Sequence, residues 1–223
     1  MSFDLCPERR TTDATCGRGA KSAEVRRPTR ERNVTCVLTW RRARSMLPLV
    51  LAAVPPPKVS VTFSPVTEKS LAAAFAIESA SYPEDEAATE AKLLVRMREA
   101  PEFFHGAFTA EGKLEGFICG TLTTASTLTE ESMSVHEPAG DTLCIHSVVV
   151  EERLRRNRVA TWMLRSYLQK VSTLQKVSRV LLMCKQPLVG LYESTGFANL
   201  GPSDVVHGQD PWILMQYDGR ERD

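Results

Sequence analysis

The chain has 223 residues, of which 43% are hydrophobic and 25% are charged, and its formal net charge is +1. This length and apolar content are enough for one folded domain with a buried core plus an extension. The charge is uneven, because residues 1–57 hold 11 Lys/Arg against 5 Asp/Glu while the remainder holds 17 against 22. The larger part is therefore mildly acidic, which argues against nucleic acid as its main partner.

Residues 1–57 are predicted to be a basic, poorly structured leader that ends in the triple proline Pro55–Pro57. The strongly apolar run in this segment, Met46–Val54, has nine residues. A helix that spans a bilayer needs about 20. We therefore expect no membrane association.

The six cysteines show neither the spacing of a zinc site nor that of a disulfide framework. Cys119, Cys144 and Cys184 lie in apolar, strand-like runs, where a free cysteine behaves as a small hydrophobic residue. This usage predicts a reducing, cytoplasmic environment and no bound metal.

From residue 58 onward the pattern predicts one mixed α/β domain over residues 58–218. Its front half is expected to hold a strand, two helices and a β-hairpin followed by a polar loop. In chain order these are a strand at 59–63, a helix capped by Thr67, a second helix starting within 82–88, strands at 103–109 and 114–123, and a loop at 123–141 containing a short helix.

The back half alternates strands and helices, which predicts a βαβ crossover on an otherwise antiparallel sheet. The continuous apolar run 179–184 is typical of a strand covered on both faces. The predicted elements are a strand at 143–150, a helix at 158–172, a strand at 179–184, a helix at 187–195 ended by Gly196, and strands at 197–200 and 212–217.

The segment 142–161 carries the strongest chemical signal. An apolar strand bears one histidine, His146, and leads into a basic turn that opens an amphipathic helix. The free N–H groups and positive dipole of a helix start bind anions, and Arg155, Arg156 and Arg158 favour phosphate. These arginines could also form a solvated surface, but positive charge at a helix start opposes the dipole unless an anion binds. The pattern predicts catalysis on a phosphate-bearing cofactor.

Four matches carry a family resemblance: Tyr82-Pro-Glu-Asp-Glu-Ala-Ala88 (with Gly201–Gly208 and Pro211-Trp212), Cys144-Ile-His-Ser-Val-Val-Val150, Arg155-Arg-Asn-Arg-Val-Ala160, and Leu191-Tyr-Glu-Ser-Thr-Gly-Phe197. Together they resemble the GNAT acetyltransferase superfamily and, within it, the arylalkylamine N-acetyltransferases. The resemblance covers residues 59–217 and implies the GNAT acyl-CoA N-acyltransferase fold. It also implies acetyl-CoA as co-substrate and a small primary amine as partner.

The resemblance implies roles for individual residues. His146 would be the general base, which an amine protonated at neutral pH requires before it can attack a thioester, and Tyr192 would protonate the departing thiolate. Cys144 joins them at the strand as a catalytic candidate, and Tyr82, Pro83 and Trp212, with Met133 on a closing loop, would bind the acceptor. The implied cofactor-binding residues are Val148, Val149, Val150, Arg155, Arg156, Asn157, Arg158, Val159, Ala160, Thr161 and Tyr192.

Two positions depart from the family pattern. Cys144 stands where the vertebrate enzymes carry the first of two histidines, and a nucleophilic role for it is disfavoured because a thiol in an apolar strand has a raised pKa. Arg158 stands at the loop's glycine position, where glycine lets backbone amides approach the diphosphate without a Cβ. We expect catalysis with an altered affinity for the cofactor.

The expected function is therefore direct transfer of acetyl from acetyl-CoA to an arylalkylamine in a ternary complex, by a monomer or weak dimer. Alternatives are a polyamine or protein amine as acceptor, a non-catalytic acyl-CoA-binding module, and a purely structural domain. At residue level His146 could simply be a core histidine, Tyr192 a core aromatic, and Val148 and Val150 part of an ordinary paired strand.

Overall fold

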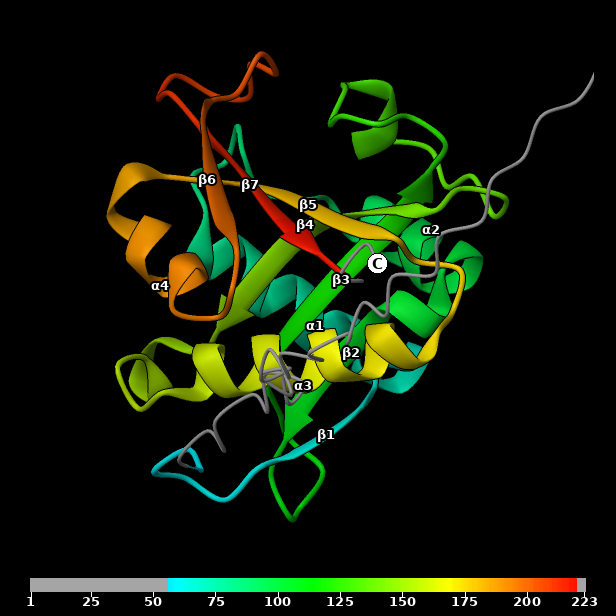
Figure 1. Cartoon of the computed structure of the whole chain (residues 1–223). Helices are drawn as coiled ribbons and strands as arrows, with labels where there is room; N and C mark the ends of the chain where they lie inside the picture. Colours follow the sequence, from blue (N-terminus) through cyan, green and yellow to red (C-terminus); the bar gives the residue numbers. More distant parts are fainter. Residues whose placement is uncertain (1–55, 220–223) are drawn as a thin grey trace, which may run out of the picture. The chain divides into compact units, whose positions relative to one another are not determined.

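A mixed sheet of seven strands forms the centre of the described residues, 56–219, of the computed structural model (Figure 1). The strand order is β1-β2-β3-β4-β5-β7-β6. All neighbouring strands pair antiparallel except β4 and β5, which are parallel and joined by a helix. The expected mixed α/β class and βαβ crossover are thus confirmed. The strands are β1 (Thr62–Pro65), β2 (Phe104–Phe108), β3 (Leu114–Thr123), β4 (Thr142–Val150), β5 (Arg179–Cys184), β6 (Ala198–Pro202) and β7 (Ile213–Asp218).

Side-chain contacts cap the starts of the first two α-helices, and the second of these begins at Glu90, later than the predicted start within 82–88. Ser70 Oγ accepts the Thr67 N–H at 3.1 Å at the start of one helix, and Thr89 Oγ1 accepts the Lys92 N–H at 3.2 Å at the next. The last helix is followed by Gly196 at φ +98°, a conformation that costs a side-chain-bearing residue more than glycine. The helices are α1 (Glu68–Ser81), α2 (Glu90–Glu99), α3 (Val159–Thr173) and α4 (Val189–Glu193).

Helices cover both faces of the sheet, with α3 across one face and α1 and α2 on the other (Figure 1). Phe104 and Phe117 are fully buried on the α1/α2 side, and Met163 and Tyr167 are fully buried on the α3 side. Burial of one such side chain stabilises the fold by about 1.5–3 kcal/mol. The Tyr167 hydroxyl donates to Phe103 O at 2.9 Å, so its polar end is satisfied inside the core.

One strand prediction was wrong in position. The expected strand at 59–63 is β1 at Thr62–Pro65, because β2 is short and offers partners only from Phe108 back to His105. Val59 and Val61 still pack partly buried against the core, outside the ladder. Their alternating pattern reflects half-burial of an edge segment rather than strand pairing.

The predicted leader, residues 1–57, and the apolar run within it lie almost wholly outside the described residues. Among residues 56–219, none of the helices is both long enough and apolar enough to cross a bilayer. Within the same residues, no group of three or more His, Cys, Asp or Glu side chains is arranged to hold a metal ion. The thiols of Cys119, Cys144 and Cys184 are free and buried.

Candidate active site

Strands β4 and β5 separate halfway along their length. Their parallel pairing covers Thr142 to Ile145 on β4, whereas the pairing of β4 with β3 continues to Val150. The second half of β4 therefore has no strand partner on the β5 side, where side chains contact its backbone at Val148 and Val150. Unpaired backbone groups inside a protein need other partners, so this gap suits a ligand that offers amide and carbonyl groups.

A cavity of about 440 Å³ fills this gap. Its floor is Val148–Val150, one wall is the turn and first residues of α3, and the other wall comes from α4. Arg155 holds the turn in place, because its Nε donates to Val150 O at 3.1 Å and its Nη2 donates to Ser81 Oγ at 3.2 Å. We refer to this cavity of about 440 Å³ as the cofactor cavity.

Arg156 and Arg158 adopt left-handed backbone conformations, with φ of +62° and +64°. They are the only non-glycine residues at positive φ between residues 56 and 219. Holding such a residue there costs about 1–3 kcal/mol, so the surrounding structure imposes this shape on the turn. Arg158 thus takes the conformation that glycine would favour at this position. The first-turn N–H groups of α3, beginning at Val159, have no intrahelical partners and border the cavity.

The strand β4 contains a β-bulge at His146. Cys119 on β3 pairs with Ser147 and Gly120 pairs with Ile145, so His146 has no partner in the ladder. A bulge places an extra residue on one strand and redirects its side chains. As a result both His146 and Ser147 line the same cavity, although strict alternation would put them on opposite faces.

The tautomer of His146 depends on the orientation of the Thr121 hydroxyl. Thr121 Oγ1 lies 3.2 Å from Ser132 O and 2.7 Å from His146 Nε2. When the hydroxyl donates to Ser132 O, its oxygen accepts from Nε2–H and the lone pair of His146 is on Nδ1; when it donates to Nε2, the lone pair is on Nε2. Nδ1 is buried and has no hydrogen-bond partner among residues 56–219. Burial and the Arg96 charge hold the pKa of His146 well below its usual value, so the ring is neutral at neutral pH.

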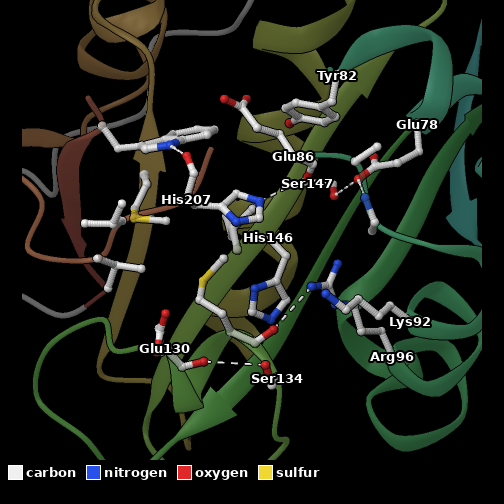
Figure 2. A pocket seen from close by; sticks show the side chains of 18 of the residues that line it. Glu78, Tyr82, Glu86, Lys92, Arg96, Glu130, Ser134, His146, Ser147 and His207 are labelled. Atoms are coloured by element: carbon white, nitrogen blue, oxygen red, sulfur yellow. Dashed lines mark hydrogen bonds between the residues drawn. The ribbon is translucent and has the colours of Figure 1, made fainter. Parts of the chain in front are cut away.

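A second cavity, of about 460 Å³, is lined in part by His146 and Ser147 of this bulge (Figure 2). It contains both charged groups and apolar surfaces. We refer to it as the acceptor cavity. Its lining comes from separate parts of the chain. The first half contributes Glu78 of α1, Tyr82 and Glu86–Ala88 from the loop after α1, and Lys92 and Arg96 of α2. The second half contributes Glu130, Glu131, Met133 and Ser134 from the segment before β4, Ile145–Ser147 of β4, Met183 of β5, and Val205–His207 with Trp212 from the loop before β7.

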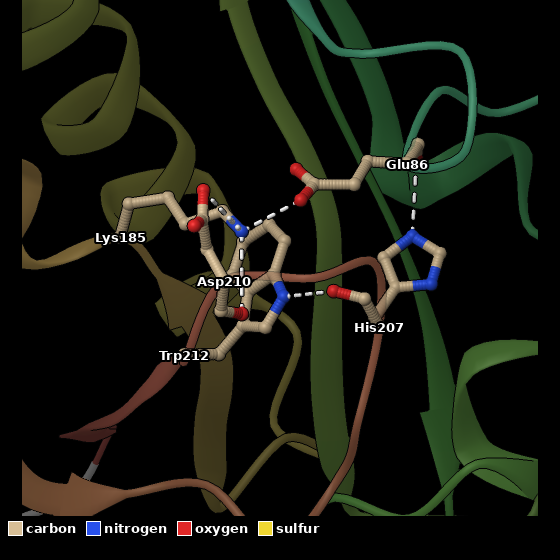
Figure 3. Close-up of polar contacts among 5 residues, drawn as sticks. All are labelled: Glu86, Lys185, His207, Asp210 and Trp212. Carbon is tan, nitrogen blue, oxygen red and sulfur yellow. Dashed lines mark hydrogen bonds and ion pairs between the residues drawn. The ribbon is translucent and has the colours of Figure 1, made fainter.

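A cluster around Lys185 fixes one wall of the acceptor cavity (Figure 3). Lys185 Nζ lies 2.6 Å from Glu86 Oε1 and 4.0 Å from the centre of the Trp212 ring. Trp212 Nε1–H donates to His207 O, and His207 Nε2 lies 3.0 Å from Glu86 O. The loop after α1, the end of β5 and the loop before β7 are thereby tied together.

Tyr82 belongs to both cavities, which makes it the seam between them. Desolvation of its phenol, followed by the nearby Glu78 charge, raises its pKa, and a hydrogen bond with the Val148 backbone partly offsets this. Tyr192, from α4, lines the cofactor cavity, and its ring packs edge-on against Phe197 at 5.8 Å. Burial, followed by the neighbouring Tyr82, raises the pKa of Tyr192 well above its usual value. Both phenols therefore keep their protons at neutral pH.

A family profile described as "Acetyltransferase (GNAT) family" matches residues 71–197. The chain belongs to this family. Serotonin N-acetyltransferase of Mesocricetus auratus is 35% identical over 116 residues, which are 52% of this chain and 56% of that protein. The enzyme of the same name from Macaca mulatta is 34% identical over 108 residues, 48% of this chain and 52% of that protein. The chain thus matches about half the length of these curated relatives, and the resemblance to the arylalkylamine branch is confirmed.

Solved structures give the same fold for this GNAT chain. A GNAT-like decarboxylase, GphF, in complex with isobutyryl-CoA has a TM-score of 0.64 at 16% identity, over 71% of this chain and 100% of that chain. Ard1 from Thermoplasma volcanium has a TM-score of 0.59 at 22% identity, over 73% of this chain and 100% of that chain. At these identities the likeness concerns the fold alone.

Most residues expected at the site of this GNAT domain line one of the two cavities, but three do not. Cys144 is fully buried against Leu128 and Leu181 and borders neither cavity. Burial raises the pKa of its thiol to about 11. Pro83 is exposed and outside the acceptor lining. The Asn157 amide donates to Leu154 O and Arg155 O, which makes it a support of the turn rather than part of the lining.

Sequence reasoning missed several polar residues of the acceptor side, namely Glu78, Glu86, Arg96, Thr121, Ser147, Lys185 and His207. A signal existed for Glu78, since it continues the buried stripe of α1 seven residues after Leu71. A charged residue in such a stripe is rarely buried without a partner. The others come from segments that only the folded topology brings together.

Proposed function

We propose that this GNAT chain is an acetyl-CoA-dependent N-acetyltransferase that acts on a small primary amine of the arylalkylamine class. The observation that supports it best is the meeting of two cavities at Tyr82, next to the bulge that bears His146. One cavity has the backbone groups and cationic turn that suit an acyl-CoA. The other has a neutral base and a mixed apolar and acidic lining that suits an amine.

On the cofactor side, the chain offers backbone rather than side-chain chemistry. The unpaired second half of β4 can pair with the amide-bearing arm of CoA, and the turn from Arg155 to Arg158 with the start of α3 can receive the diphosphate. In this scheme the Val148 N–H stabilises the negative charge that develops on the thioester oxygen, in place of the hydrogen bond between the Val148 backbone and Tyr82. No side chain needs to form a covalent intermediate in this scheme.

On the acceptor side, the protonated amine must lose a proton before its nitrogen can attack the thioester. With the Thr121 hydroxyl donating to Ser132 O, neutral His146 has its lone pair on the unpartnered Nδ1 and accepts the proton from the amine nitrogen, directly or through one water. The nitrogen lone pair attacks the thioester carbon and the carbon–sulfur bond breaks. Tyr192 gives its hydroxyl proton to the leaving thiolate and regains one from solvent. His146 passes the first amine proton to solvent, takes the second proton from the nitrogen as the amide forms, and passes that one to solvent as well. Each turnover of a protonated amine therefore yields one amide, one thiol and one released proton.

The acceptor class follows from the lining. Tyr82, Met133 and Trp212 provide apolar surface for a ring, while Glu78 and the more exposed Glu130 and Glu131 favour a cation. A polyamine is the second candidate because four carboxylates border the cavity. The partial neutralisation of Glu86 by Lys185 and the aromatic walls favour one positive charge on an aromatic body.

The test is a turnover assay of the purified full chain with acetyl-CoA and a panel of amines. We expect tryptamine and phenethylamine to be acetylated with higher kcat/KM than spermidine or a lysine peptide. Preference for spermidine would favour the second candidate. Binding of acetyl-CoA without turnover of any amine would instead indicate a non-catalytic acyl-CoA-binding module.

A further inference from the structure

We propose that Glu78 is the ammonium anchor of the acceptor cavity: its Oε2 accepts a hydrogen bond from the protonated acceptor amine and selects cationic over neutral ligands. The inference rests on the proposed function, which supplies the amine. It adds a specificity-determining residue on α1 that does not belong to the motifs on β4, the cofactor turn or α4.

The geometry of Glu78 leaves one oxygen for a ligand. The residue is 2% exposed, and its Oε1 accepts both the Ala88 N–H at 3.1 Å and the Ser147 hydroxyl at 2.9 Å. Oε2 is buried and has no hydrogen-bond partner among residues 56–219. Figure 2 shows the Glu78 carboxylate directed toward Ser147 within the cavity lining.

A buried carboxylate oxygen without a donor is costly, because ionised Glu can only accept hydrogen bonds. Burial raises the pKa of Glu78, and the two donors to Oε1 and the Arg96 charge counteract this. Arg96 does not satisfy Oε2, since its guanidinium donates to Met133 O at 3.3 Å and lies near Cys119 Sγ. An ammonium group carries three N–H donors and a positive charge, which is the complement that Oε2 lacks.

The other carboxylates of the cavity are less suited to this role. Glu86 already pairs with Lys185 at 2.6 Å. Glu130 and Glu131 are exposed at the surface, where charge is screened by water. Glu78 also accepts a hydrogen bond from Ser147, the residue next to His146, so an amine held by Oε2 lies beside the proposed base.

The experiment compares a cation with its neutral counterpart in the full chain saturated with CoA. Calorimetry measures the affinity of phenethylamine and of 2-phenylethanol, which replaces the ammonium by a hydroxyl. In E78Q we expect the phenethylamine Kd to rise by about tenfold or more while the 2-phenylethanol Kd stays within about twofold. Glutamine keeps an oxygen for Ala88 and Ser147 and removes the charge.

Glu115→Gln is the matched control. Glu115 is a fully buried carboxylate on β3 that pairs with Arg153 and lines neither cavity, so E115Q removes a buried charge outside the site. We expect E115Q to retain the parent's preference for the cation. Thermal unfolding of each variant confirms that the protein under test is folded.

Three outcomes overturn the inference: E78Q keeps the cation preference, E78Q loses both ligands equally, or E115Q shows the same loss as E78Q. The second outcome would reduce Glu78 to a support of the loop that follows α1. Failure of the proposed function has a different signature, namely no turnover of any amine by the parent chain. A parent that acetylates amines together with an unselective Glu78 therefore rejects only the anchor.

Discussion

The two cavities on either side of Tyr82 are built in different ways. The cofactor cavity uses one nearly continuous stretch, Val148–Thr161, with α4 closing it. The acceptor cavity collects single side chains from both early helices, the loop before β4, the end of β5 and the loop before β7. Chemistry carried by backbone groups thus comes from contiguous sequence, and chemistry carried by side chains comes from topology.

This difference has a physical cause. A diphosphate and an amide-bearing arm are met by N–H and C=O groups, which every residue supplies once the backbone has the right shape. Arg158 illustrates this, because it takes the left-handed conformation in place of glycine. An amine with an aromatic body needs charge and shape from particular side chains, so substitutions there should change specificity. The variants below test this contrast, from the largest expected effect to the smallest.

His146→Gln should have the largest effect on the rate. Loss of the base should lower kcat by about 10²-fold or more and leave the Kd of acetyl-CoA unchanged. Because the folded-state pKa of His146 is depressed, its neutral form persists as pH falls through 6.5 and is lost only at lower pH. The parent should therefore show no loss of kcat from His146 between pH 7 and 6. A mutant that matches the parent at pH 7 would exclude the base role.

Tyr192→Phe should lower kcat by about tenfold or more through loss of the proton donor to the thiolate. Acetyl-CoA binding, measured by calorimetry, should change little because the ring still packs on Phe197. Tyr82→Phe removes a phenol of the same kind at the seam and should mainly raise the KM of the amine. If Tyr82→Phe costs more kcat than Tyr192→Phe, the two roles are assigned the wrong way round.

Lys185→Met tests the acceptor side alone. It leaves the Glu86 carboxylate unpaired, with that side chain only 4% exposed, and removes the cation from the Trp212 ring. We expect the KM of phenethylamine to rise by about tenfold, as for a broken buried pair, with the acetyl-CoA Kd unchanged. The double variant K185M/E86Q should recover part of the loss. If the affinities for phenethylamine and for acetyl-CoA fall by the same factor, the two cavities do not act independently.

Arg158→Gly tests the cofactor side alone and should have a small effect. Glycine relieves about 1 kcal/mol or more of backbone strain at φ +64° but removes a guanidinium from the phosphate site. These terms oppose each other, so the acetyl-CoA Kd should change by less than about fivefold, as measured by calorimetry. A gain far above that would mean that the arginine impairs binding in the natural loop.

His105→Phe lies outside both cavities and should leave activity at pH 7 unchanged. Burial lowers the pKa of His105 to about 4 from 6.5, and its ring stacks on Phe63 at 5.4 Å. A depressed histidine pKa contributes stability that is present above pH 6.5 and is lost as pH falls toward 4, by up to about 3 kcal/mol. Urea unfolding at pH 7 and pH 5 should show this loss for the parent and a smaller one for the variant. Equal losses would contradict the assignment.

The sequence predicted the order of elements well, because hydrophobic period is a local signal, and most residues of its Arg155–Ala160 motif line a single cavity. It misplaced β1, since half-burial at Val59 and Val61 produces the same alternation as a paired strand. It could not predict the bulge at His146, which depends on how β3 and β4 pair. The Lys185 cluster joins segments about a hundred positions apart, such as Glu86 with Lys185, and no local pattern records that.

Calorimetric titration of acetyl-CoA and of CoA into the full chain tests the central claim most directly. The gap between β4 and β5, with the turn at Arg155 and the start of α3, predicts one binding site for each ligand, with measurable heat and a stoichiometry of about one. Absence of heat from both ligands, in protein shown to be folded, would contradict it.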